Sequence, residues 1–168
     1  SVVFKNDYWI NNLRTLHAFQ SKIAKKAIAM LDNVEIPTIV AIGDSSGVHI
    51  QYLLNLYGGD KIKVISVNID PVAVDKVIGK GLEAIHSNAE LLHEHPDFNE
   101  KTNIFLSYEM LEHLFDPISF LHNMSTKSEC DFFVITVPYV LSSRVGLHQV
   151  RGRGDKQQAL NAETTHIF

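Results

Sequence analysis

The chain has 168 residues, of which 45% are hydrophobic and 20% charged, so it is long enough for one domain with a core and too apolar to be wholly disordered. Nineteen acidic residues against fifteen lysines and arginines give a formal charge of −4, which argues against the broad basic field of a nucleic-acid-binding protein. A single cysteine, no apolar run of membrane-spanning length and no signal-peptide pattern predict a cytoplasmic protein that does not enter a membrane.

The first predicted element is an amphipathic helix over residues 6–32. Its apolar positions recur close to the 3.6-residue period of a helix, with one polar exception, Gln20. Lysines fall on the opposite side, which we expect to face solvent. Pro37 prevents the helix from continuing.

After Pro37, short runs rich in β-branched residues alternate with stretches of helical length. Nearly every residue of these runs is apolar, so each strand is expected to be buried on both faces, as in a parallel sheet. The series predicts an α/β fold: a Rossmann-like, open and mostly parallel sheet with helices on both faces, in three layers. The expected strands are 38–42, 62–69, 82–86, 103–107 and 132–137.

In an open parallel sheet, ligands bind beyond the carboxyl ends of the strands, near the point where the strand order reverses. The most informative segment there is the turn 43–47, Gly-Asp-Ser-Ser-Gly, which follows the first strand. Glycines let the backbone turn sharply and approach a ligand, and the next helix begins with free N–H groups. Packing alone also explains such a turn. The other segments expected at this edge are Asn68–Asp70, Ser87–Glu90, Ser107–His113 and Pro138-Tyr139.

Taken together, the segments TIVAIGDSSG, KVISVNIDP, HSNAELL, TNIFLSYEMLEHLFDPISFL and DFFVITVPY resemble the class I S-adenosylmethionine-dependent methyltransferases, over residues 38–139. The resemblance points to the branch with an E-x-x-E-H segment after the fourth strand. It implies a seven-stranded sheet, whose final antiparallel hairpin we do not find in this sequence. It also implies one methyltransferase-like domain, with a helical segment at 1–36, a cofactor-binding core at 37–139 and an acceptor-side loop region at 140–168.

The resemblance implies S-adenosyl-L-methionine as the cofactor and assigns residues to it. The glycine turn would face the methionine part, the end of the second strand the ribose, and the segment after the third strand the adenine. The end of the fourth strand would also face the methionine part. The cofactor-binding residues so implied are Gly43, Asp44, Ser45, Gly47, Asn68, Ile69, Asp70, Asn88, Ala89, Ser107 and Tyr108.

The sequence departs from the family where the family has acids. Asn68 and Asn88 stand at the ribose and adenine positions, and each exchanges a charge-assisted hydrogen bond of about 1.5–3 kcal/mol for a neutral one near 1 kcal/mol. Two such losses weaken cofactor affinity by roughly tens-fold. Side chains alternate along a strand, so we hypothesise that Asp70, on the same side as Asn68, takes part of the ribose role. Ala41 and Asn103 stand where the family has acids before the first glycine and in the fourth strand, and Ser45 stands at the middle glycine.

Glu109, Glu112 and His113 follow the fourth strand at positions i, i+3 and i+4, which share one face if the segment is helical. Three interpretations are open. With His166, or less well His148, they form a site for Mg²⁺ or Mn²⁺ that lowers the pKa of an acceptor hydroxyl. The acids otherwise only stabilise the start of a helix, or His113 acts alone as a general base. Glu109 and His113 are the expected catalytic residues.

The basic residues of the C-terminal region suit an anionic acceptor group, although a solvated charged loop explains them as well. They are Arg144, Arg151, Arg153 and Lys156. The sequence thus predicts a methyltransferase that acts on an oxygen of a small molecule, with nitrogen as the second choice and nucleic acid disfavoured. The main alternative is a non-catalytic relative that uses a weakened cofactor site for binding or assembly. A nicotinamide-dependent dehydrogenase fits less well, because its glycine loop normally has three glycines.

Overall fold

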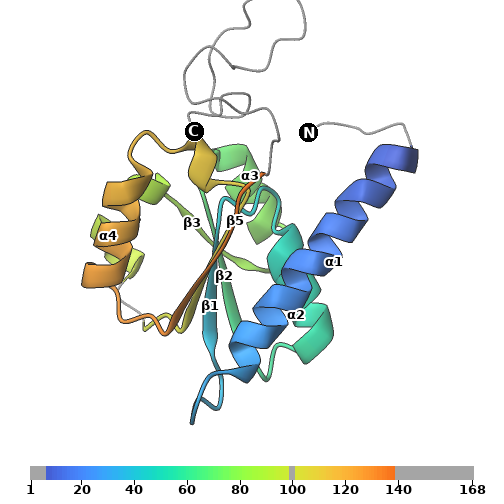
Figure 1. Cartoon of the computed structure of the whole chain (residues 1–168), viewed down its shortest axis with the longest axis horizontal. Coiled ribbons are helices and arrows are strands. Elements are labelled where there is room, and N and C mark those ends of the chain that lie inside the picture. Colours follow the sequence, from blue (N-terminus) through green and yellow to red (C-terminus); the bar gives the residue numbers. More distant parts are fainter. Residues whose placement is uncertain (1–6, 99–100, 139–168) are drawn as a thin grey trace, which may run out of the picture.

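The computed structural model describes residues 7–98 and 101–138 and contains a sheet of five strands (Figure 1). The strands lie in the order β3-β2-β1-β4-β5, and each pairs with its neighbours in parallel. The chain moves outward from β1 to β3 and then places β4 on the other side of β1, so the strand order reverses between β1 and β4. The strands are β1 (Thr38–Ile42), β2 (Lys63–Asn68), β3 (Glu83–His86), β4 (Ile104–Tyr108) and β5 (Phe132–Thr136).

Helices cover both faces of the sheet, which gives three layers (Figure 1). One buried apolar cluster joins the sheet to α1, α2 and α3 and includes Leu53 and Val77. A second cluster joins the other face to α4 and three short 3-10 helices and includes Phe120 and Met124. The α-helices are α1 (Asp7–Ala29), α2 (Val48–Tyr57), α3 (Pro71–Ile78) and α4 (Pro117–Lys127), and the 3-10 helices are η1 (Ala89–Glu94), η2 (Pro96–Phe98) and η3 (Leu111–His113).

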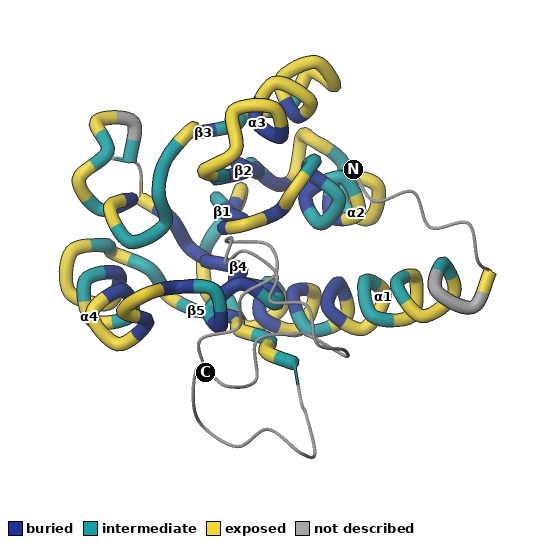
Figure 2. Tube along the Cα trace, turned by 90° about the horizontal axis from the view of Figure 1, so that it is seen from above, coloured by how far each residue is buried: buried dark blue, intermediate teal, exposed yellow. Residues whose placement is uncertain are grey.

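Helix α1 packs across the end of the sheet formed by β4 and β5, and it also contacts α2. Among the α1 residues whose burial is described, the buried ones all lie in its second half, where the helix faces the sheet (Figure 2). They include Ala24 and Ala27, whose small side chains let the helix approach closely, and Gln20, which is 1% exposed. A buried glutamine requires hydrogen-bond partners, and these connect α1 to the candidate site described below.

Two aspartates begin the helices that follow β2 and η3. Asp70 accepts a hydrogen bond from the Val72 N–H, and Asp116 accepts one from the Ser119 N–H. In both cases proline occupies the first turn, where its missing N–H costs nothing. The hydrogen bond from Ser119 also lowers the pKa of the Asp116 carboxyl.

The fold class predicted from the sequence is confirmed, and the strands differ from the expected ones by at most one residue at either end. None of the helices in the described ranges is long and apolar enough to cross a membrane. Tyr139 and the region 140–168, which we expect to lie beside an acceptor, are outside the described residues.

Candidate functional site

The site expected from the sequence lies at the carboxyl ends of the strands, beside the reversal of strand order. The turn after β1 and the end of β4 are neighbours there, because Ile42 pairs with Ser107 in the parallel register. The end of β2 lies on the other side of the turn, and the Gly43 N–H donates to the Val67 carbonyl (2.8 Å). The fold therefore brings the first, second and fourth predicted segments to one edge.

The glycine turn has an unusual backbone. Gly43, Ser45 and Gly47 all adopt left-handed conformations, with φ values of 75°, 46° and 80°. A side chain on Gly43 would place its Cβ only 2.6 Å from Met110 Cγ, and one on Gly47 would meet Val77 at 3.1 Å. Both glycines are thus required by packing and backbone conformation, whether or not a ligand binds. Ser45 adopts the same region without that freedom, which is locally strained.

Asp44, between the two glycines, is a buried carboxylate. It is 2% exposed. Its oxygens accept hydrogen bonds from the backbone N–H groups of His49 (2.8 Å) and Ile50 (3.2 Å), in the first turn of α2. The His49 ring adds a third contact, with Nδ1 2.7 Å from Asp44 Oδ1. Because an ionised carboxylate only accepts, Nδ1 carries a proton. Asp44 therefore fixes the turn against the start of α2.

Beyond His49 the contacts continue into α1. His49 Nε2 lies 3.1 Å from Gln20 Oε1, and Gln20 Nε2 donates to the Thr136 hydroxyl (3.1 Å) at the end of β5. The Tyr108 hydroxyl donates to the Gln20 backbone carbonyl (3.0 Å). We call Asp44, His49, Gln20 and Thr136 the α1–turn chain.

Two ionisable side chains border this chain. The His17 ring stands edge-on to the His49 ring, with centroids 5.2 Å apart. Burial lowers the pKa of His17 below its ordinary value of 6.5, the His49 charge lowers it further and the Asp44 charge partly offsets both. Burial, and secondarily the Asp44 charge, raises the pKa of the Tyr108 phenol, which stays protonated in its hydrogen bond to α1.

The predicted ribose-binding residues are already hydrogen-bonded to one another. Asn68 donates through Nδ2 to the Ser45 carbonyl (3.4 Å) and accepts through Oδ1 from the Asp70 N–H (2.9 Å). Because β2 ends at Asn68, the strand alternation from which we placed Asp70 beside it does not apply, and Asp70 instead caps α3. Ile69 between them is 58% exposed, and its carbonyl lies 3.0 Å from His86 Nε2.

The segment predicted to meet adenine begins η1. Asn88 caps this 3-10 helix by accepting from the Glu90 N–H (3.0 Å), and Ala89 is half-buried at its first position. Glu90 reaches the start of α4, where its carboxylate accepts from the Asp116 N–H (2.8 Å). The side-chain oxygen of Asn88 is therefore already occupied by a hydrogen bond within η1.

Ser107, the next-to-last residue of β4, is the one predicted cofactor residue whose buried side chain lacks a hydrogen-bond partner. Its side chain is fully buried, and its hydroxyl has no hydrogen-bond partner. The other serine of this kind among the described residues is Ser66, which lies in the middle of β2. A buried hydroxyl without a partner costs free energy, so Ser107 suits a ligand that arrives at the end of its strand.

The Glu-x-x-Glu-His segment is not the helix expected from its spacing. Glu109 has φ 51°, in the left-handed region, and its N–H donates to the Thr136 carbonyl (2.9 Å). Only 111–113 form a 3-10 turn, in which Glu112 is buried with Oε1 3.8 Å from His113 Nε2. The prediction that Glu109, Glu112 and His113 share one face of a helix is therefore wrong. Within 7–98 and 101–138, no three carboxylate, imidazole or thiolate groups are placed to hold a metal ion, and His148 and His166 lie outside these ranges.

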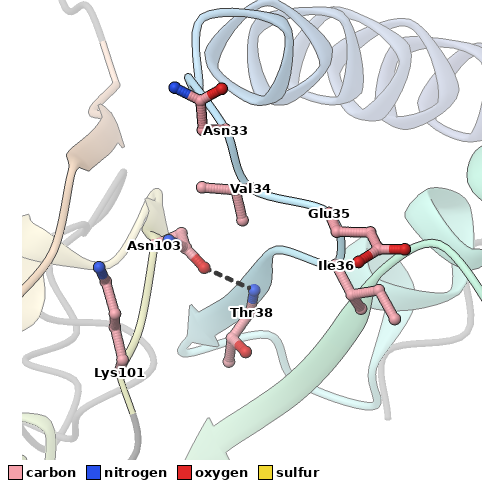
Figure 3. Close-up of a pocket in the computed structure, with 7 residues that line it drawn as sticks. All are labelled: Asn33, Val34, Glu35, Ile36, Thr38, Lys101 and Asn103. Carbon is pink, nitrogen blue, oxygen red and sulfur yellow. Dashed lines mark hydrogen bonds between the residues drawn. The ribbon is translucent and has the colours of Figure 1, made fainter.

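A cavity of about 350 Å³ opens at the opposite, amino-terminal edge of the sheet (Figure 3). Asn103 lines it and bridges three strands there, accepting from the Thr38 N–H (2.9 Å) and donating to Asp131 (2.9 Å). Asn103, noted in the sequence as a missing strand-four acid, is thus a structural bridge far from the carboxyl edge. The other lining residues are Asn33, Val34, Glu35, Ile36, Thr38 and Lys101.

Compared by sequence, the chain matches no family profile and no curated protein. Compared by structure, it is similar to the plantazolicin methyltransferase BamL, solved with a desmethyl-plantazolicin analogue and S-adenosylhomocysteine (19% identity over 67% of this chain and 41% of BamL, TM-score 0.54). It is also similar to the CurJ carbon methyltransferase (15% identity over 67% of this chain and 31% of that one, TM-score 0.58). A third similar structure is a Haloferax volcanii methyltransferase in complex with the Trm112 activator (20% identity over 77% of this chain and 61% of that one, TM-score 0.50).

These likenesses establish that the chain has the fold of the class I S-adenosylmethionine-dependent methyltransferases. They confirm the resemblance found in the sequence at the level of the fold. The chain spans less than two thirds of the length of each of these three proteins. SpnF, a [4+2]-cyclase, also shares the fold (8% identity over 65% of this chain, TM-score 0.50), so the fold by itself does not fix the reaction.

Sequence reasoning predicted Asp44 as a cofactor-binding residue but missed its connection to α1 through His49 and Gln20. The one available signal was Gln20, a polar residue at a buried position of an otherwise apolar helix stripe. It could have indicated a buried hydrogen-bond partner, although not which residue supplies it.

Replacing Gly43 with alanine should lower the free energy of unfolding by at least about 1 kcal/mol, from the left-handed backbone alone, with a further loss from displacing Met110. Gly59→Ala is the matched control, because a Cβ there meets only Leu54 at 3.9 Å. Urea denaturation of both variants measures the difference. Equal, small losses would show that the turn does not hold the conformation described.

The lowered pKa of His17 predicts that the protein loses stability as pH falls. The unfolded chain binds a proton at His17 near pH 6.5, whereas the folded chain resists it, so stability is retained above about 6.5 and declines below it. His17→Gln should therefore flatten the dependence of the urea midpoint on pH between 7.5 and 5.5. A variant with the wild-type slope would contradict the burial of His17, the main cause of its lowered pKa.

Proposed function

We propose that the protein is an S-adenosylmethionine-dependent methyltransferase that methylates an oxygen atom of a small-molecule acceptor. The observation that carries this proposal is the pairing of a left-handed glycine turn with the partnerless Ser107 hydroxyl, at the point where the strand order reverses. The methyltransferase fold supports the same position for a cofactor.

The residues present suit a nucleoside cofactor at this edge. The exposed backbone of Gly43 and Ser45 permits close approach to the methionine part, and Ser107 offers a hydroxyl beside it. Asn68 and Asp70 stand at the ribose position, and Asn88 and Ala89 at the adenine position. When bound, S-adenosylmethionine supplies a methyl group on a positively charged sulfur.

For methyl transfer the protein itself must align an acceptor oxygen and exclude water from it. Glu109 and His113 are the proposed groups that hold or remove the acceptor proton, because Glu109 directly follows β4 at the carboxyl edge and His113 ends the 3-10 helix that comes next. The hydrogen bond from the Glu109 N–H to Thr136 fixes the backbone of Glu109 between β4 and β5. We propose no metal ion for this step. The proposed acceptor side, residues 140–168, includes the arginines suited to an anionic acceptor.

A second candidate is a binding or assembly domain that retains the fold without methyl transfer. The side chains of Asn68 and Asn88 favour it, because both replace acids and both are engaged in local hydrogen bonds. Calorimetric titration with S-adenosylhomocysteine separates the two. Saturable binding favours the methyltransferase, and absence of binding to this product and to S-adenosylmethionine favours the alternative.

Ser107→Ala should stabilise the unliganded protein slightly, or leave it unchanged, because it removes a buried hydroxyl without a partner. It should at the same time weaken binding of S-adenosylhomocysteine by about five- to tenfold, the value of one hydrogen bond. Ser66→Ala, the matched control in β2, should have the same effect on stability and none on binding. If both variants bind equally well, Ser107 does not contact the cofactor.

Asp70 has a cap role that must be separated from a cofactor role. Asp70→Ala should lower the free energy of unfolding by about 1 kcal/mol through loss of the α3 cap, whereas Asp70→Asn should keep most of it. If Asp70 also binds the ribose as a carboxylate, Asp70→Asn weakens S-adenosylhomocysteine binding despite its near-normal stability. Calorimetry and urea denaturation of the two variants decide the matter, and unchanged affinity in both excludes the ribose role.

A further inference from the structure

The α1–turn chain connects the candidate cofactor turn to α1, the helix that packs against β4 and β5. It runs from the Asp44 carboxylate through the His49 ring to the Gln20 amide and on to Thr136, with contacts of 2.7, 3.1 and 3.1 Å. Gln20 and Asp44 are 1% and 2% exposed. The connection therefore lies in the interior of the molecule, where each polar group depends on its partner.

The Asp44 carboxylate makes this dependence costly to break. An ionised carboxylate removed from water is tolerated only when it is paired and hydrogen-bonded. Its side-chain partner is the His49 ring, and the other nitrogen of that ring is held by Gln20 of α1. If α1 moves away, His49 loses that contact and the pair with Asp44 becomes open to water. The conformation of the turn and the packing position of α1 are thus thermodynamically coupled.

The connection does not depend on one protonation state of His49. With the Gln20 amide as placed, Nε2 donates to its oxygen. If the amide turns by half a rotation, its nitrogen donates to a neutral Nε2, and the Thr136 hydroxyl donates to its oxygen instead of accepting. Both states keep the helix joined to the turn, so the chain serves as a connection rather than as a pH switch.

The apolar contacts of α1 come from Ala24 and Ala27 and from the partly buried Ile23 and Ile28. Gln20 adds directional hydrogen bonds to these contacts, because both its side chain and its carbonyl are fixed, the latter by Tyr108. Gln20 is therefore the residue that holds α1 in register with the ends of β4 and β5.

We propose that His49 is a positioning residue that couples helix α1 to the glycine turn, so that a cofactor bound at the turn also holds α1 against the sheet. The coupling is reciprocal. The factor by which a bound cofactor favours the packed position of α1 is also the factor by which α1, held through Gln20, raises cofactor affinity. This inference rests on the proposed cofactor site and adds to it a part of the protein that does not contact the cofactor.

Hydrogen exchange of the whole chain, measured by mass spectrometry with and without S-adenosylhomocysteine, tests the coupling. In the wild type, the ligand should slow exchange of the second half of α1 by at least about fivefold, the lower end of ordinary coupling between sites. In His49→Asn the side-chain amide keeps the contact to Asp44 but is too short to reach Gln20. That variant should still bind the ligand, about three- to tenfold more weakly, while the slowing falls below about twofold.

His17→Asn is the matched control, because it makes the same chemical change in a ring that touches His49 without joining the chain. It should keep the ligand-induced protection of α1. Gln20→Met breaks the connection from the other side and should behave like His49→Asn, which keeps the test decisive if one variant folds poorly.

Two results overturn the inference. One is wild-type protein that binds S-adenosylhomocysteine with no change in α1, and the other is full protection in both His49→Asn and Gln20→Met. Failure of the wild type to bind at all, in the same titration, instead removes the proposed function and the coupling together.

Discussion

The buried carboxylate of Asp44 is the interaction on which the candidate site depends. It lies between two glycines that must adopt left-handed conformations, and it ties the turn to the first turn of α2 and to His49. Without that anchor, the turn would lose its side-chain hydrogen bonds to the start of α2. Through His49 and Gln20 the same carboxylate is also connected to α1.

Much of the fold follows from the sequence because burial on two faces leaves a plain signal. β1 and β4 are buried along almost their whole length, so their apolar runs identified a parallel sheet, and the reversal of strand order placed the glycine turn beside Ser107. Pro71 and Pro117 occupy the first turns of α3 and α4, because proline is tolerated there and not further along a helix.

The details of the site could not be predicted, because they depend on single backbone conformations and on contacts between distant segments. The spacing of Glu109, Glu112 and His113 fits a helix, but one left-handed residue at Glu109 ends the regular structure before a helix can begin. Asp70 lies beyond the end of β2 at Asn68 and begins α3, so the alternation of side chains along the strand does not extend to it. The bond between Gln20 and Thr136 spans 116 residues, and no local pattern encodes it.

The most direct test of the account is a crystal structure of the protein grown with S-adenosylhomocysteine. The account predicts the sulfur and amino-acid portion of the ligand against the turn 43–47, with the Ser107 hydroxyl in hydrogen-bond contact and the ribose beside Asn68. A ligand seated elsewhere, for example in the cavity lined by Lys101 at the amino-terminal edge, or a crevice that stays closed at saturating ligand, would contradict it.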